Sequence, residues 1–209
     1  GVILSDSDEL EGRFPSGKAN LCTSTLAYGG LISAADIARE LGHEEEREEF
    51  LAFAKSLHEN INTFFGANVS GYDAYRYYEE NDKLRSWICI PLTMGIFERR
   101  DGTIAALLSD KLFGKDGLVC EEGNATYWDR STLYALRGIL NAGHSDEVWD
   151  FIKYYVNNRL LTEHVPYAIE AYPEGNKRHL AAESALFARI VTEGMFGFVP
   201  TGFNSFTLT

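Results

Sequence analysis

Three stretches of the sequence concentrate side chains that could bind or cleave a sugar. Aromatic rings stack on the apolar face of a pyranose, while carboxylates, guanidinium groups and imidazoles bond its hydroxyls. The same mixture is enriched at protein interfaces, so composition leaves both kinds of site open. The side chains are Tyr72, Asp73, Tyr75, Arg76, Tyr77, Tyr78, Glu79 and Arg85 in the first stretch, Glu121, Glu122, Tyr127, Trp128, Asp129 and Arg130 in the second, and His164, Tyr167, Glu170, Tyr172, Glu174, Lys177, Arg178 and His179 in the third.

The elements that must position these stretches are predicted helices, in which mostly apolar segments alternate with amphipathic ones. Residues 25–41 and 180–191 are apolar around most of the helical circumference and rich in small side chains, which predicts buried inner helices. Residues 44–65 carry apolar side chains on one face and charges on the other, which predicts an outer helix. The same patterns predict inner helices at 87–97 and 131–142 and outer helices at 103–112 and 145–161.

The connections between these helices alternate in length. Links from an inner to an outer helix are tight, at Gly42-His43, 99–102 and Gly143-His144, whereas the return links span 66–86, 113–130 and 162–179. In stacked antiparallel α-hairpins the long links all emerge on one face, at the amino ends of the inner helices. Long ordered loops are usually functional, so the site is predicted on that face. Alternation within 66–86 predicts a small β-hairpin turning at Asn81-Asp82.

Composition excludes several classes of protein. The 209 residues are 45% hydrophobic and 24% charged, which supplies a packed core and excludes a disordered chain. A net charge of −12 repels phosphate backbones and argues against a nucleic-acid partner. No apolar run is long enough to span a membrane. Three widely spaced cysteines and five scattered histidines match no zinc pattern, so no metal and no cofactor is expected.

Two runs of the sequence resemble a known superfamily. Residues 127–138 read YWDRSTLYALRG and residues 170–186 read EAYPEGNKRHLAAESAL, while RSWICIPL at 85–92 is similar in kind. These runs resemble the six-hairpin glycosidases, the bacterial (α/α)6 toroid glycoside hydrolases that include rhamnosidase-like, glucoamylase-like and fucosidase-like enzymes. The likeness covers most of residues 20–206 and extends to the superfamily, with no short signature that selects one family within it.

The resemblance implies an all-α fold in which antiparallel α-hairpins form part of an (α/α)6 toroid. It also implies carbohydrate binding in the mouth of the toroid and hydrolysis of glycosidic bonds by two carboxyl groups, often with inversion. A full toroid has twelve helices, seven are predicted here, and the chain begins with Gly1. We therefore expect residues 1–209 to be a single helical domain, the carboxy-terminal portion of a larger glycosidase domain. Cellular location and oligomeric state stay open.

Three carboxylates are candidates for the hydrolytic pair. Asp129 precedes an inner helix, where free amides and the helix dipole favour the anion, so it is predicted to act as a base or to hold a sugar hydroxyl. It is equally open to being a plain N-cap. Glu170 and Glu174 lie among aromatic residues, where desolvation would raise a pKa and suit the acid. Solvated loop glutamates are the alternative for both.

The remaining candidates are predicted to bind the substrate. Trp128 and Tyr172 are expected to stack on sugar rings, and ordinary packing is the alternative for both. Glu183 falls in a small, apolar helix and must be paired, with Arg178 or Arg130, or face the central cavity. The other candidate binding residues are Tyr72, Arg130, Arg178 and His179, of which His179 could equally be structural.

Other functions remain open at this point. A noncatalytic carbohydrate-binding module would keep the pocket without the hydrolytic pair. A sugar epimerase of the same toroid fold would rely on a pair of histidines, for which His164 and His179 are the candidates. A helical-repeat scaffold for protein partners is disfavoured, because the sequence has no fixed repeat period.

Overall fold

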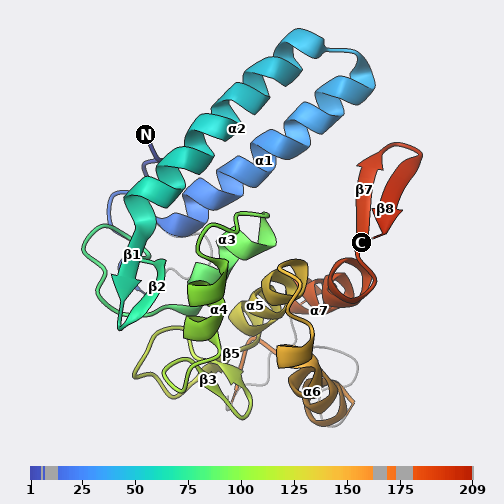
Figure 1. Ribbon diagram of the computed structural model, residues 1–209. Coiled ribbons are helices and arrows are strands. Elements are labelled where there is room, and N and C mark those ends of the chain that lie inside the picture. Colours follow the sequence, from blue (N-terminus) through green and yellow to red (C-terminus); the bar gives the residue numbers. More distant parts are fainter. Residues whose placement is uncertain (6, 8–13, 162–168, 173–180, 209) are drawn as a thin grey trace.

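Two long antiparallel helices open the fold. The computed structural model describes residues 1–208 except residues 6, 8–13, 162–168 and 173–180. Helices α1 (Leu21–Leu41) and α2 (Glu44–Phe65) form an antiparallel hairpin that extends away from the other helices (Figure 1). The Asn20 side chain caps α1 by accepting from the Thr23 N–H at 2.8 Å. Gly42, at φ 77°, ends the helix as predicted.

Helix α1 is less buried than its sequence predicts. Its first turns are covered, but Ile37 and Leu41 near its end are 55% and 59% exposed. The prediction of a helix buried on all sides is therefore wrong for the second half of α1. The reason is tertiary, because α2 packs along one side of α1. Only parts of the remainder are reached by other elements, namely a 3₁₀ turn (Ser86–Cys89), helix α3 (Ile90–Thr93) and strand β7 (Phe198–Gly202).

The first long connection forms the predicted β-hairpin, but at a different turn. Strands β1 (Gly66–Val69) and β2 (Tyr72–Tyr75) pair in antiparallel register. Ser70 and Gly71 form the two-residue turn, with φ of 52° and 96°, as a hairpin with right-handed twist requires. The predicted turn at Asn81-Asp82 is wrong. Asn81 is buried, and its side-chain oxygen accepts from the Tyr77 N–H at 3.0 Å, which stabilises a loop instead.

The next predicted helix pair is shorter than its pattern indicates. A 3₁₀ turn (Ser86–Cys89) leads into α3 (Ile90–Thr93), with Pro91 in the first turn as predicted. Gly95 at φ 78° and the Ile96 N–H, which donates to Pro91 O at 2.9 Å, end the helix before residue 97. Helix α4 (Arg100–Leu107) begins earlier and ends earlier than the predicted 103–112. The Ser109 hydroxyl donates to Ala106 O, and the chain turns there into β3.

Helix α5 is the centre of the second half of the chain. Short strands β3 (Phe113–Gly114) and β4 (Gly117–Leu118) pair with each other, and β5 (Tyr127–Trp128) leads directly into α5 (Asp129–Asn141). Helix α6 (Asp146–Tyr155) continues as a π-helical turn (Val156–Leu160), close to the predicted 145–161. Helix α5 contacts α3, α6, α7 and the short strands β4 and β5, with Leu133, Leu136 and Ile139 fully buried.

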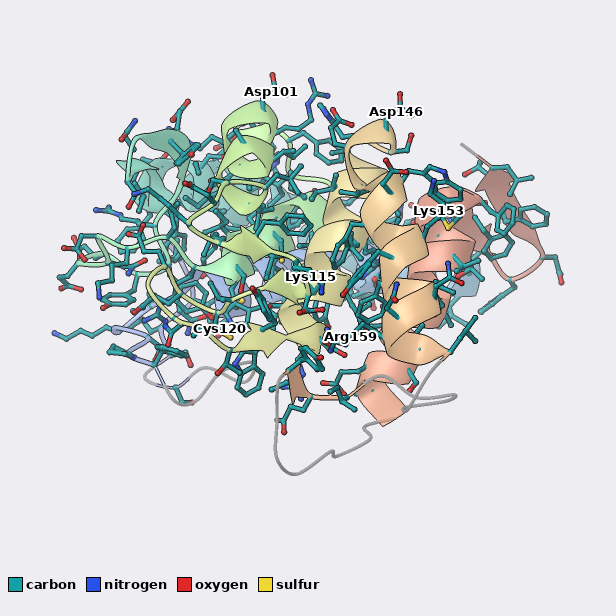
Figure 2. The ribbon with its side chains drawn as sticks, turned by 90° about the horizontal axis from the view of Figure 1, so that it is seen from below. Asp101, Lys115, Cys120, Asp146, Lys153 and Arg159 are labelled. Atoms are coloured by element: carbon teal, nitrogen blue, oxygen red, sulfur yellow. The ribbon has the colours of Figure 1, made fainter. Side chains whose placement is uncertain are left out.

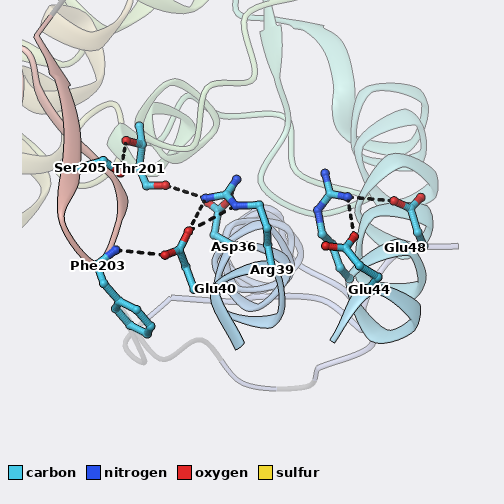
Figure 3. A network of polar contacts seen from close by, with 9 residues as sticks. Asp36, Arg39, Glu40, Glu44, Glu48, Thr201, Phe203 and Ser205 are labelled. Carbon is cyan, nitrogen blue, oxygen red and sulfur yellow. Dashed lines mark hydrogen bonds and ion pairs between the residues drawn. The ribbon is translucent and has the colours of Figure 1, made fainter. Parts of the chain in front are cut away.

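The chain ends in a helix and a β-hairpin. Strand β6 (Ala171–Tyr172) precedes α7 (Ala181–Arg189), which runs into a π-helical segment (Ile190–Met195). Strands β7 (Phe198–Gly202) and β8 (Ser205–Leu208) form the final hairpin. Figure 3 shows how this hairpin is tied to the end of α1: Arg39 donates to the Thr201 carbonyl, and the Phe203 N–H donates to the Glu40 carboxylate.

The predicted all-α class is confirmed. The described strands form four two-stranded antiparallel pairs around a helical core, which runs from α1 through α3 and α5 to α6 and α7. Among the helices that the structure describes, none combines the length and apolar character needed to cross a membrane.

Candidate functional site

The second and third long connections meet at the amino end of α5. Strand β5 pairs with β6, so that Tyr127 lies opposite Tyr172 and Trp128 opposite Ala171. The Asp129 N–H extends this ladder by donating to Glu170 O at 3.0 Å. Four predicted site residues, Trp128, Asp129, Glu170 and Tyr172, are therefore neighbours, although two of them lie more than 40 positions along the chain from the others.

The first connection joins the same group of loops. Arg85 forms an isolated β-bridge with Glu121, and its buried guanidinium donates from Nε to the Glu121 carboxylate at 3.0 Å. The Ser70 hydroxyl donates to Glu122 at 2.6 Å. In the described residues, the first long connection thus contacts the second, and the second contacts the third. This agrees with the prediction that the long links emerge on one face of the helices.

Asp129 lies in a buried polar cluster with Arg159 and Tyr155. Its carboxylate is 1% exposed and accepts from Arg159 Nη2 at 2.6 Å and from the Tyr155 hydroxyl at 2.9 Å. Asp129 is the first residue of α5, and Trp128 occupies the N-cap position before it, so the alternative of an N-cap aspartate is not found. Burial raises its pKa to about 6, against the lowering effects of Arg159 and Tyr155.

Arg159 is a central residue of this site that the sequence pattern does not identify. It belongs to the π-helical turn after α6, and its side chain is 3% exposed. Its guanidinium lies 4.1 Å from the centre of the Tyr172 ring and donates from Nη1 to Asp116 O at 2.8 Å. Figure 2, viewed from below, places Arg159 between the end of α6 and the short strands. The sequence feature that could have identified Arg159 is its position at the end of the apolar stripe of the predicted helix 145–161, where a buried arginine needs a partner.

A second buried ion pair joins α5 to α7. Glu183 is 0% exposed, and its Oε1 accepts from Arg130 Nε at 2.7 Å, which is one of the pairings that the sequence predicts. Its Oε2 is buried and has no hydrogen-bond partner in the part of the chain that the structure describes. Burial raises the pKa of Tyr155 well above its usual range, and Asp129 and Glu183 raise it further, so the two ion pairs share one electrostatic environment.

The other predicted residues lie in different surroundings. Trp128 is 7% exposed and packs with Cys120, Ala171 and Phe14, whereas Tyr172 and Glu170 are half-buried. Tyr72 lies on β2, which packs against α4 and not against the β5–β6 pair. The predicted residues Glu174, Arg178 and His179, and the histidine pair His164 and His179, lie outside the described residues.

This arrangement suits a polar, partly aromatic binding surface. Two carboxylates and two guanidinium groups balance each other in charge, and the half-buried Tyr172 ring lies against the Arg159 guanidinium. Among the described residues no three His, Cys, Asp or Glu side chains are grouped as metal ligands. Guanidinium, carboxylate and tyrosine groups are donors and acceptors of the kind that bind hydroxyl groups.

Comparison with known proteins links this fold to glycoside hydrolases. No family model and no curated protein matches the sequence. A sialidase of known structure aligns with 94% of the chain at a TM-score of 0.72 and 14% identity, and a neutral trehalase from Saccharomyces cerevisiae aligns with 81% at a TM-score of 0.58 and 15% identity. The chain covers 21% of the sialidase chain and 37% of the trehalase chain. The fold is therefore glycosidase-like, and the predicted α-hairpins as part of an (α/α)6 toroid agree with the trehalase match.

Proposed function

We propose that this chain is part of a glycoside hydrolase and that it contributes sugar-binding and catalytic groups at the amino ends of α5 and α7. The observation that carries the proposal is the β5–β6 pairing, which gathers Trp128, Asp129, Glu170 and Tyr172 at one helix end. The glycosidase-like fold supports the reaction class. We further propose that residues 1–209 are the carboxy-terminal portion of a larger six-hairpin domain; the partial coverage of the two matched chains supports a larger domain.

The substrate is an oligosaccharide or glycoside. The half-buried ring of Tyr172 offers an apolar face for a pyranose, and Arg130 at the amino end of α5 offers guanidinium donors for hydroxyl groups. Arg178 and His179 complete the proposed binding set beside the β5–β6 pair, whereas Tyr72 is proposed as a binding residue on β2, apart from that pair. Trp128 supports the Tyr172 strand from within the small cluster around Cys120.

Hydrolysis requires one protonated carboxyl group at the leaving oxygen and one carboxylate that activates water or attacks the sugar. Glu170 and Glu174 are the proposed sources of the acid, because both flank Tyr172 in the third connection. Asp129 is proposed as the second carboxylate. With a pKa of about 6 it is mostly ionised at pH 7. No cofactor enters this chemistry.

The burial of Asp129 also favours a positioning role. Both of its oxygens accept hydrogen bonds, and its ion pair fixes the Arg159 guanidinium over the Tyr172 ring. Loss of the carboxylate in Asp129→Asn would then weaken substrate binding and raise KM while kcat changes little. If Asp129 acts on the reacting atoms, kcat falls by about 10²-fold or more and KM changes little.

The direct test is hydrolysis. The chain is assayed with trehalose, a sialylated oligosaccharide and a panel of aryl glycosides, beside Glu170→Gln, Glu174→Gln and Asp129→Asn. The matched control is Glu59→Gln, an exposed glutamate on the outer face of α2. We expect either Glu170→Gln or Glu174→Gln to lose turnover, and with it the dependence of the rate on a carboxylic acid that titrates between acidic and neutral pH. Wild-type turnover and pH profile in both would place the acid elsewhere.

A noncatalytic carbohydrate-binding module is the second candidate. The observation that favours it is that Asp129 and Glu183 are both engaged in buried ion pairs, which leaves the hydrolytic pair to residues of the loops. Calorimetry with the same oligosaccharides, run beside the hydrolysis assay, separates the two functions. Binding without turnover supports the module, and turnover eliminates it.

A further inference from the structure

A polar cavity lies at the opposite end of α5 from the β5–β6 site. It has a volume of about 290 Å³ and is formed by the last turns of α5, the π-helical segment after α7 and strand β7. Arg137, which lines it, lies about 12 Å along the helix axis from Asp129 at 1.5 Å per residue. None of the residues proposed to bind sugar lines this cavity, so it is a separate site.

The charged side chains of the cavity carry one excess positive charge. Glu193 Oε2 accepts from Arg137 Nε at 2.8 Å, and Arg137 Nη2 lies 2.8 Å from the same oxygen as an ion pair. The same carboxylate accepts from Arg189 Nε at 2.5 Å and from Arg189 Nη2 at 3.0 Å. Two guanidinium groups therefore share a single carboxylate, and the described charged residues that line the cavity are these three.

Arg137 retains an unused donor. Its side chain is 11% exposed, and its Nη1 is buried without a hydrogen-bond partner in the described part of the chain. A buried donor left without an acceptor is costly, and a charged one more so. Burial first and then the neighbouring Arg189 lower the pKa of Arg137, so the protein environment by itself opposes this charge. An anion beside the Arg137 and Arg189 side chains in the cavity would offset the repulsion between the two charges.

The opposite wall selects the kind of anion. Phe198, Val199 and Pro200 of β7 line the same cavity and give it an apolar part beside the two arginines. A guanidinium group matches a planar carboxylate through two parallel hydrogen bonds. One carboxylate also balances the single excess charge, whereas a phosphate dianion would overcompensate it.

We propose that this cavity binds a small monocarboxylate whose apolar part packs against β7 and whose carboxylate contacts Arg137 and Arg189. The cavity would act as an accessory site for an acidic ligand, at the opposite end of α5 from the sugar site. The proposal does not depend on hydrolysis, because its residues and its ligand differ from those of the proposed active site.

Isothermal titration calorimetry with benzoate tests the proposal. Benzamide has the same ring without the charge, and inorganic phosphate has charge without the ring. We expect benzoate to bind at least about tenfold more tightly than benzamide, and Arg137→Gln and Arg189→Gln each to weaken benzoate by about tenfold, as the loss of a charge-assisted hydrogen bond implies. The matched control is Arg100→Gln, an exposed arginine that also pairs with one carboxylate, Asp101.

Amide chemical shifts locate the binding site, and the expected changes centre on Gly194 and Val199. Circular dichroism checks that each variant is folded. If Arg137→Gln is unfolded, Arg189→Gln decides the question, since its side chain is 48% exposed and contributes less to the core. Equal binding of benzoate and benzamide, tighter binding of phosphate, or an equal loss in Arg100→Gln would overturn the proposal.

Discussion

Replacing Asp129 by Asn tests how burial and ion pairing balance in the polar cluster. The substitution keeps the size of the side chain and removes its charge, while Arg159 and Tyr155 stay in place. Two effects oppose each other in the wild type. The ion pair with Arg159 stabilises the carboxylate at 2.6 Å, and burial at 1% exposure destabilises it. Because the pKa rises to about 6, burial is the larger effect.

The pKa fixes the sign and the size of the expected change. A carboxyl group whose pKa is higher in the folded state binds its proton more tightly there. Its stabilising contribution is therefore complete below about pH 3.8 and is lost as the pH rises through about 6. A rise of the pKa from 3.8 to about 6 corresponds to about 3 kcal/mol in total, of which about 2 kcal/mol falls between pH 4 and pH 7.

Urea unfolding at half-unit steps from about pH 4 to pH 7.5 measures this contribution. We expect the free energy of unfolding of Asp129→Asn, relative to the wild type, to increase by about 2 kcal/mol from pH 4 to pH 7. The matched control is Asp150→Asn, whose side chain is 94% exposed and paired with Lys153 on the surface of α6. Its curve should run parallel to that of the wild type. A relative stability of Asp129→Asn that falls with rising pH would refute the reasoning, because the ion pair would then dominate.

Three further predictions concern the core. Glu183→Leu should lower the free energy of unfolding by about 3 kcal/mol in urea titrations, because Arg130 loses its partner, and the double variant Arg130→Met/Glu183→Leu should recover part of that loss. Gly138→Ala should cost about 1–3 kcal/mol in the same assay, because a Cβ would lie 2.9 Å from a leucine Cβ on α3 and 3.1 Å from a carbonyl oxygen. A cost near zero would mean that α3 shifts freely. Cys89 should react with a disulfide reagent only on global unfolding, since burial raises the pKa of its thiol and leaves it inaccessible, and fast labelling of the native protein would contradict the described core.

The buried cluster has a consequence for the proposed hydrolase. Arg159 is held on three sides, by Asp129, by the Asp116 carbonyl and by the faces of Tyr172 and Tyr155. Such a network fixes the orientation of Tyr172, and with it strand β6, which directly follows Glu170. A rigid support of this kind positions loop residues that touch a substrate more accurately than the loop alone could.

Helix positions were largely predictable, because local signals decide them. Residues 44–65 combine an apolar stripe with a charged face, and the helix has those bounds. Gly42 and Gly143 adopt positive φ at the helix ends where they were expected. The errors arose where two local signals compete. Alternation within 66–86 correctly predicts a hairpin, and Asn81-Asp82 is a typical turn sequence. In the structure the hairpin turn is formed by Ser70-Gly71, while the Asn81 side chain accepts from the Tyr77 N–H and stabilises a loop.

Contacts between residues that are distant in the sequence were the least predictable feature. Asp129 and Arg159 lie 30 positions apart, and Arg137 and Glu193 lie 56 apart, so neither pair has a signature within one helix. The β5–β6 pair is two residues long on each side, too short for alternation to reveal. Periodicity states which face of an element is buried, but not which element covers it, as the exposed end of α1 shows.

The sequence by itself therefore determined the all-α class, the order of the helices and the loops that carry the candidate site. Each of these depends on side chains that are close along the chain, where helical spacing and capping act directly. The tertiary structure alone decided that Asp129 is a buried partner of Arg159 and that two arginines share Glu193 at the other end of α5. Ion pairing and desolvation depend on distances between elements, and those distances exist only once the helices have packed.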